Sequence, residues 1–288
     1  SLVSELTPLD EKGRPIRNSI LYSDNRAVEE IEYVNKVLGT TLTSEEITPK
    51  ILWMKKHEPR NYEKTRMIVN AVSYIVWKLT GRFTVCRGLA YGYGGIFDPV
   101  KGNWSEEACE KLGIPVDIFP PAYSPVEVAG EVTAEASKET GLAEGTPVIV
   151  GTGDGAMSSL GAGMVEEGDG MIYYGTAGLF NVLDQDLEKR LTGVWEFRIG
   201  EYGSAYMLTS GEALRWFRDR LGFQELEAER HLGLSAYHLL DEEAEKIPPG
   251  SEGVIVLPYF MGQRSPEFDP SARAVIFGLS ISHTRVHI

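Results

Sequence analysis

The sequence predicts an α/β fold built as two domains. Segments with strand character alternate with segments of helical spacing in both halves of the chain, which is typical of this class. A length of 288 residues with 42% hydrophobic residues is enough to bury two ordinary cores. The segment LAEGTP, which contains turn-forming glycine and proline, ends at Pro147, and the order of predicted helices and strands changes after it. We therefore predict a first domain of residues 1–147 and a second of residues 148–288.

The first domain opens with a predicted hairpin. Residues 2–10 and 18–26 have strand character on either side of the turn EKGRP. Helical spacing follows in Arg26–Leu38, and Gly39 ends it. The segment 87–104, rich in glycine and aromatic residues, is predicted to be a loop. Further helices are predicted for residues 50–59, 67–81, 105–113 and 133–141, with Ser105 and Thr133 as caps of the last two.

The second domain alternates strands and helices more regularly. The segment 147–151 is predicted to be a buried strand, and 170–183 a strand, a tight turn and a second strand. Small residues in 156–164 suit a helix that packs closely. The remaining strands are predicted at 202–210, at 253–260 and at the start of 274–288, and the remaining helices at 211–222 and 235–247.

Charge and composition narrow the classes of function. The formal net charge is −14, which disfavours binding to nucleic acids or anionic membranes, because both need basic patches. No apolar run approaches the roughly 18 residues of a membrane span, and the first residues do not resemble a signal peptide. Neither Cys86, Cys109 nor the five histidines show metal-type spacing. We expect a cytoplasmic protein that takes a small-molecule substrate and holds no metal by its own side chains. A homodimer is left open.

One stretch, Val148–Phe180, concentrates glycine around a single aspartate. Asp154 stands between Gly153 and Gly155, directly after an apolar run, and a second glycine turn follows at Gly175–Gly178. Glycine at this density indicates sharp bends or close approach of the backbone to another group. Three interpretations compete.

The first interpretation is a dinucleotide loop, because Gly151–Ala156 fits G-x-G-x-x-A after a strand. That fingerprint also needs an acidic residue at the end of the next strand, which here ends at Thr176 instead. A P-loop is excluded, because G-x-x-x-x-G-K-[ST] does not occur. The second interpretation is structural: the glycines permit tight turns, and Asp154 is the N-cap of a helix.

The third interpretation is phosphoryl transfer. An aspartate at the end of a strand, without bulky neighbours, can accept a proton from a substrate hydroxyl. The turn Gly175–Thr176–Ala177–Gly178 can offer backbone N–H groups and one hydroxyl to a phosphate. The base and the phosphate cradle would then lie on adjacent elements.

The same stretch resembles the FGGY carbohydrate kinases, which include xylulokinase, gluconokinase and glycerol kinase. In that family a strand leads to G-G-x-D, whose aspartate is the catalytic base, and a later G-T-S-G binds the ATP phosphates. These motifs correspond to Gly151–Asp154 and Gly175–Gly178, with the small-residue segment Gly161–Gly163 between them. The resemblance favours the third interpretation.

Other family motifs follow in order along the chain. GRPIRNSILYSDNRA, with Asp24 and Arg26, resembles the family's G-x-P-x-R-x-x-I-x-W-x-D-x-R. Lys50 and Trp53 match its K-x-x-W, and LPYFMGQRSPEFDPSARAVIFGLSISHTR resembles a motif near the family's C-terminal side. The resemblance therefore extends over nearly the whole chain.

The resemblance implies an actin-like ATPase fold, related to ribonuclease H, with two α/β domains. It implies ATP-dependent phosphorylation of a sugar or polyol hydroxyl, with a ketopentose such as xylulose as the favoured acceptor. Asp154 would be the catalytic base, and Mg²⁺ would bridge the ATP phosphates. The acceptor would lie at Asp154, Gly155, Asp24 and Arg26, and the nucleotide at Gly175, Thr176, Ala177 and Gly178.

The chain also departs from the family pattern. Gly155 stands where many pentulose kinases carry asparagine, and Ala177 replaces the serine of G-T-S-G. The family's D-x-G-T hairpin and its C-terminal helices do not occur, so the sequence resembles the central part of such a kinase, incomplete at both ends. A second function is therefore open: a non-catalytic fragment or regulatory binding protein that keeps the kinase fold.

Overall fold

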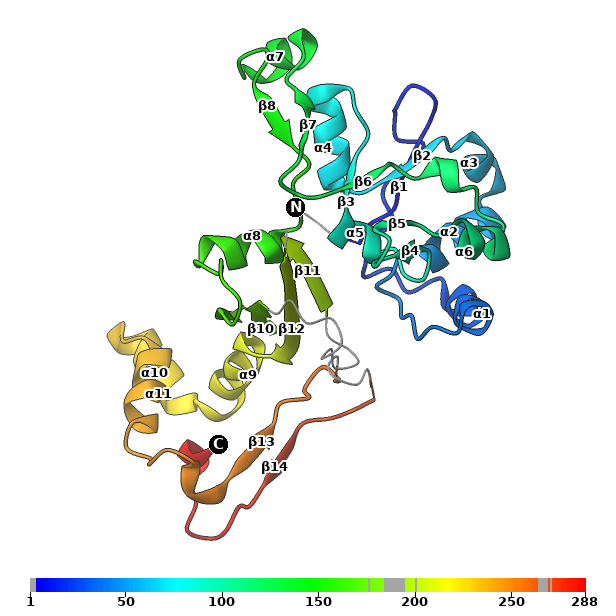
Figure 1. Ribbon diagram of the computed structural model, residues 1–288. Helices are drawn as coiled ribbons and strands as arrows, with labels where there is room; N and C mark the ends of the chain where they lie inside the picture. Colours follow the sequence, from blue (N-terminus) through cyan, green and yellow to red (C-terminus); the bar gives the residue numbers. More distant parts are fainter. Residues whose placement is uncertain (1–3, 176, 184–194, 200, 264–268, 270) are drawn as a thin grey trace. The chain divides into compact units, whose positions relative to one another are not determined.

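A computed structural model describes residues 4–175, 177–183, 195–199, 201–263, 269 and 271–288 (Figure 1). The chain divides into two compact units, Ser1–Gly163 with Phe197–Tyr202, and Met164–Glu196 with Gly203–Ile288. Each unit combines helices with strands. The α/β class that the sequence predicts is confirmed.

The first unit begins with a strand pair that differs from the predicted hairpin. β1 (Thr7–Leu9) is antiparallel to β2 (Met67–Val69). The predicted second arm, residues 18–26, pairs near this point through a single bridge between Leu6 and Ile20. The segment around β1 therefore pairs with β2 and also keeps contact with the predicted arm through Leu6 and Ile20.

The helix predicted for residues 67–81 is shorter in the structure, because β2 takes its first residues. α4 (Ala71–Thr80) begins after Asn70, whose side-chain oxygen accepts the N–H of Ser73 at 2.9 Å. This cap defines the first turn of the helix. Gly81, at a φ of 72°, ends the helix as predicted.

The other predicted helices of the first unit form where the sequence places them. Gly39 ends the first of them in the left-handed conformation. Ser105 and Thr133 accept the N–H groups of Ala108 and Ala136 at 3.2 Å, as the cap prediction requires. These helices are α1 (Val28–Leu38), α2 (Thr48–His57), α6 (Glu106–Leu112) and α7 (Ala134–Thr140). A further helix, α3 (Pro59–Lys64), is not predicted from the sequence.

The segment 87–104, predicted to be a loop, contains a short helix and a hairpin. Asp98 sets the hairpin turn by accepting the N–H groups of Val100 and Lys101 at 3.0 Å. The elements are two to five residues long, too short to show a period in the sequence. They are α5 (Arg87–Tyr91) and the antiparallel pair β4 (Phe97–Asp98) and β5 (Asn103–Trp104). Directly before the segment, β3 (Val85–Cys86) is parallel to β6 (Ala122–Tyr123).

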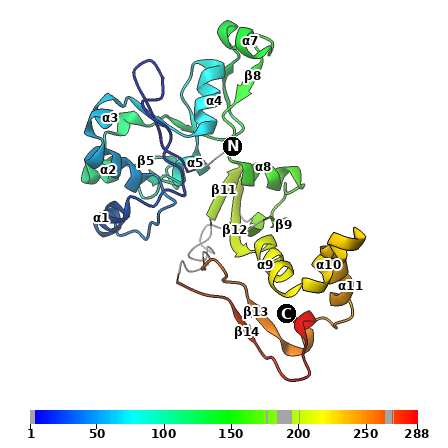
Figure 2. The same ribbon diagram turned by 180° about the vertical axis from the view of Figure 1, so that it is seen from behind.

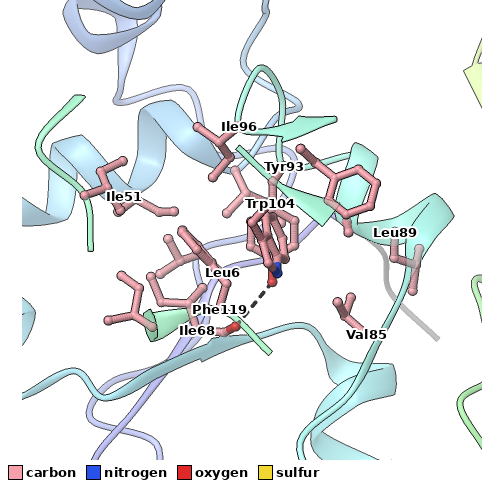
Figure 3. Close-up of a cluster of buried hydrophobic side chains, with 14 of the residues drawn as sticks. Leu6, Ile51, Ile68, Val85, Leu89, Tyr93, Ile96, Trp104 and Phe119 are labelled. Carbon is pink, nitrogen blue, oxygen red and sulfur yellow. Dashed lines mark hydrogen bonds between the residues drawn. The ribbon is translucent and has the colours of Figure 1, made fainter. Parts of the chain in front are cut away.

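Aromatic side chains occupy the centre of the first unit's core (Figure 3). The ring of Tyr93, fully buried, meets Trp104 edge to face with 5.0 Å between centroids, and Trp104 stacks on Phe119 at 4.6 Å. The indole N–H of Trp104 donates to the carbonyl of Pro120 at 2.8 Å. Each buried ring therefore gains contact area, and the polar atom of Trp104 is bonded.

The strand that leads to the glycine loop is less covered than predicted. β8 (Pro147–Ile149) is antiparallel to β7 (Val128–Glu131) in a two-stranded sheet. Pro147 and Ile149 are exposed, so the expectation of a buried strand at 147–151 is wrong. An apolar run in the sequence cannot reveal that a strand has only one neighbour.

A four-stranded sheet follows, in the order β11–β12–β10–β9. Its strands are β9 (Gly170–Tyr174), β10 (Ala177–Leu183), β11 (Trp195–Ile199) and β12 (Glu201–Thr209). β10 is antiparallel to both of its neighbours. β9 and β10 confirm the two strands predicted within 170–183.

Three helices of the second unit pack against one another (Figure 1). They are α9 (Gly211–Leu221), α10 (Phe223–Leu232) and α11 (Ala236–Ala244), of which α10 is not predicted from the sequence. Arg285 ties the end of the chain to them: its guanidinium donates to Glu225 at 2.6 Å, to Glu243 at 2.8 Å and to the carbonyl of Leu221 at 2.9 Å.

The remaining strands form an extended antiparallel ribbon (Figure 2). They are β13 (Ile255–Leu257) and β14 (Val275–Phe277), within the segments predicted as strands. Short 3₁₀ turns occur at Val116–Ile118, Ser251–Gly253 and Arg285–His287.

Candidate active site

The loop that carries Asp154 is held through its backbone. Val150 and Gly151 donate their N–H groups to the carbonyls of Glu127 and Pro125, both at 2.9 Å. Gly151 has a φ of 71°, a conformation that glycine adopts at little cost and that side chains disfavour. Gly151 therefore turns the chain sharply three residues before the aspartate.

Asp154 is the first residue of α8 (Asp154–Gly161), and its carboxylate is exposed. One carboxylate oxygen accepts the N–H of Gly155 at 3.0 Å. The N-cap position belongs to Gly153, and no side chain caps this helix. The interpretation of Asp154 as the N-cap is therefore wrong, and its carboxylate remains exposed.

Thr152 is a loop residue that the sequence analysis missed. Its hydroxyl lies 3.4 Å from Sγ of Cys86, and both side chains are buried. Cys86 ends β3, so this contact joins the loop to another part of the first unit. The only signal in the sequence is one threonine among glycines.

The two buried positions of α8 carry small residues, whereas the rest of the helix is exposed or half-buried. Ala156 and Ser159 are buried, and the hydroxyl of Ser159 donates to the carbonyl of Gly155 at 3.0 Å.

The second glycine turn connects β9 with β10. Gly178 lies opposite Tyr174 in the strand pair, and the carbonyl of Gly175 accepts the N–H of Gly211 at 2.8 Å. A Cβ added at Gly175 would lie 2.6 Å from a ring carbon of Tyr173. A side chain at 175 would therefore force the exposed Tyr173 ring to shift. Thr176 lies outside the described residues.

Asp24 and Arg26 are brought together by the structure. The guanidinium donates to both carboxylate oxygens, at 2.6 Å for the shortest contact, and lies 4.2 Å from the centroid of the Trp53 ring. The hydrogen bonds from Arg26 lower the pKa of Asp24 below its ordinary range. The pair forms a compact, charge-balanced group beside the start of α1.

Glu5 is a second residue that the sequence analysis missed. Its side chain is buried, and one oxygen accepts the N–H of Ala71 at the start of α4. The other oxygen has no partner among the described residues. Burial raises the pKa of Glu5. An acid inside an otherwise apolar strand region is the sequence signal that would have found it.

The candidate residues are distributed over both units. Asp24, Arg26, Asp154 and Gly155 lie in the first, and Gly175–Gly178 in the second. Among the described residues, no three His, Cys, Asp or Glu side chains gather in a way that could hold a metal ion. Within the same part of the chain, no helix combines the length and apolar character that crossing a membrane requires.

Solved structures with the same fold extend over nearly the whole chain. The xylulose kinase of Rhodospirillum rubrum, 30% identical, has a TM-score of 0.86 and matches 99% of this chain and 59% of its own. Plasmodium falciparum glycerol kinase with ADP, 20% identical, has a TM-score of 0.79 over 99% of this chain and 58% of its own. The fold thus defines a two-domain α/β protein of the actin-like ATPase class.

Family models and curated relatives narrow this class. The N-terminal and C-terminal domain models of the FGGY family of carbohydrate kinases match residues 2–161 and 170–288. The chain belongs to this family. It is 29% identical to the xylulose kinase of Bacillus subtilis over 98% of its length and 26% identical to the gluconokinase of the same species over 100%. It spans 57% and 58% of the length of these two relatives.

Proposed function

We propose that this protein transfers the γ-phosphoryl group of ATP to a hydroxyl of a sugar or polyol, with a ketopentose such as xylulose as the favoured acceptor. The observation that carries the proposal is the exposed Asp154 carboxylate, which follows a sharp glycine turn and has no capping role. Family membership of both halves and the similarity to xylulose kinases support the same chemistry.

The proposed reaction uses Asp154 as a general base. The acceptor hydroxyl gives its proton to the free carboxylate oxygen while its own oxygen forms a bond to the γ-phosphorus. The bond between the γ-phosphorus and the bridging oxygen breaks, and ADP leaves with that electron pair. Gly155 leaves room beside the base. We place Asp24 and Arg26 on the acceptor side.

The nucleotide is assigned to the second glycine turn. Backbone N–H groups of Gly175, Thr176, Ala177 and Gly178 would face its phosphates, since turns of this kind bind anions. Mg²⁺ would neutralise charge on the phosphate oxygens. Mg²⁺ typically keeps several waters and binds largely through substrate phosphates, which agrees with the finding that no three acidic, His or Cys side chains gather among the described residues.

The test is an acceptor panel with the complete gene product. ADP release is measured with Mg²⁺ and ATP, with and without xylulose, ribulose, gluconate, erythritol and glycerol, and phosphorus NMR identifies the product. We expect ADP release that depends on one acceptor, together with its sugar phosphate. Nucleotide or sugar binding without turnover on any acceptor would instead support the non-catalytic alternative.

A further inference from the structure

Lys50 is a buried lysine in the first turn of α2. Only 1% of its surface is exposed. Its amine donates to the carbonyl of Ser44 at 2.6 Å and to those of Tyr22 and Glu45 at 3.4 Å. Burying an ammonium is costly unless its N–H groups are bonded, and these three carbonyls match its three donors.

These contacts join two segments that are distant in the sequence. The carbonyl of Tyr22 belongs to the turn before α1, which the N–H of Asp24 closes on the carbonyl of Leu21 at 3.1 Å. The carbonyls of Ser44 and Glu45 belong to the segment before α2. The ammonium is therefore a shared donor between residues 21–26 and residues 43–46.

We propose that Lys50 is a positioning residue of the acceptor site, whose buried amine holds residues 21–26 against residues 43–46 and thereby sets the affinity for the sugar. The inference rests on the proposed function, because that function places Asp24 and Arg26 on the acceptor side. Lys50 acts through these segments: its amine is enclosed by backbone carbonyls and is not offered to a ligand.

Protonation of Lys50 gives the proposal a pH signature. Burial lowers its pKa to about 8, although Glu46, Asp24 and Glu45 act in the opposite direction. A neutral amine keeps only two of the three N–H donors, so one carbonyl contact is lost as the pH rises through about 8. The Michaelis constant for the sugar should rise in that range, while the constant for ATP should not.

The effect on global stability has the opposite sign. Between about 8 and the ordinary lysine value of 10.5, the folded chain binds fewer protons at Lys50 than the unfolded chain does. Its contribution to the free energy of unfolding therefore rises with pH in this window. A loss of sugar affinity there cannot come from unfolding driven by this residue.

The experiment compares Lys50→Met with Lys55→Met in the complete gene product. Lys55 lies on the same helix and also donates to a backbone carbonyl, that of Gly113 at 2.6 Å, but its side chain is exposed. We expect Lys50→Met to raise the Michaelis constant for the sugar about tenfold, with kcat changed by less than about twofold, and Lys55→Met to change neither. Lys50→Met should also remove the pH dependence near 8.

Hydrogen exchange supplies a measurement that does not need activity. Lys50→Met should speed amide exchange in residues 21–26 and 43–46, and Lys55→Met should not. Unchanged exchange in both segments overturns the proposal. A second result that overturns it comes from the wild type alone: a Michaelis constant for the sugar that stays constant from about pH 7 to about pH 9. Absence of turnover in the wild type with every acceptor overturns the proposed function, whereas the exchange result still decides the role of Lys50.

Discussion

The two glycine loops, Gly151–Gly155 and Gly175–Gly178, look alike in sequence but are built differently. The first enters a helix, is tied down by backbone bonds and by the contact of Thr152 with Cys86, and exposes a carboxylate. The second turns between two paired strands and carries no acidic side chain. Glycine therefore marks where the backbone must bend, and the element that follows decides whether a side chain or the backbone is offered to a ligand.

The largest expected effect lies in the first loop. Asp154→Asn removes the proton acceptor and should lower kcat by about 10²–10⁴-fold without lowering the melting temperature. Asp117→Asn is a matched control, because Asp117 is also exposed in the first unit. Near-normal turnover of Asp154→Asn would contradict the role of Asp154 as proton acceptor, and with it the proposed difference between the two loops.

A methyl group added at Gly175 should disturb the second loop. Gly175→Ala places a Cβ 2.6 Å from a ring carbon of Tyr173, so the ring or the turn must shift. The Tyr173 ring is 48% exposed and can turn aside at a small cost, so we expect a slightly lower melting temperature and weaker ATP binding by calorimetry. Gly161→Ala is the control, since no heavy atom lies within 4 Å of a Cβ there. Equal effects of the two substitutions would contradict this account.

A smaller effect is expected for the hydroxyl of the second turn. Thr176→Val should raise the Michaelis constant for ATP about threefold to tenfold, which corresponds to the loss of one hydrogen bond. The Michaelis constant for the sugar should stay unchanged. Steady-state kinetics with each substrate varied in turn measures both. A selective rise for the sugar would assign this turn to the acceptor instead of the nucleotide.

The smallest effect concerns the anchor of the first loop. Thr152→Val removes the acceptor of the Cys86 thiol, a weak donor, and should lower the free energy of unfolding by about 0.5–1 kcal/mol. Cys86→Ala removes the other partner. Chemical denaturation of both single variants and the double variant gives the coupling between them. Simple additivity would mean that this contact does not hold the loop.

Local chemistry was predictable from the sequence, whereas pairing between distant segments was not. Gly39, Ser105 and Thr133 end or cap helices as predicted, because such signals depend on residues within one turn. The assignment of residues 67–69 to β2 depends on a partner about sixty residues away in the sequence. Helix α10 lacked a recognisable start signal, since Gly222 precedes it without a side-chain cap.

The same difference between local motifs and distant partners applies to the residues of the candidate site. Ordered motifs identified Asp154, Gly175 and the pair of Asp24 with Arg26 from the sequence. Thr152 and Glu5 could not be found this way, because their partners Cys86 and Ala71 are each 66 residues away. The domain boundary at 147 and the roles of the site residues stay predictions.

The contact of Cys86 with Thr152 also gives the protein a native chemical reporter for the loop Gly151–Gly155. Of the two thiols, Cys109 is kept unreactive, because burial raises its pKa to about 11. Cys86 is buried and contacts Thr152, so a movement of this loop away from it would expose its thiol to an alkylating reagent. The rate at which mass spectrometry detects a single adduct therefore reports loop opening. Protection of that thiol by a sugar would rank ligands without any turnover assay.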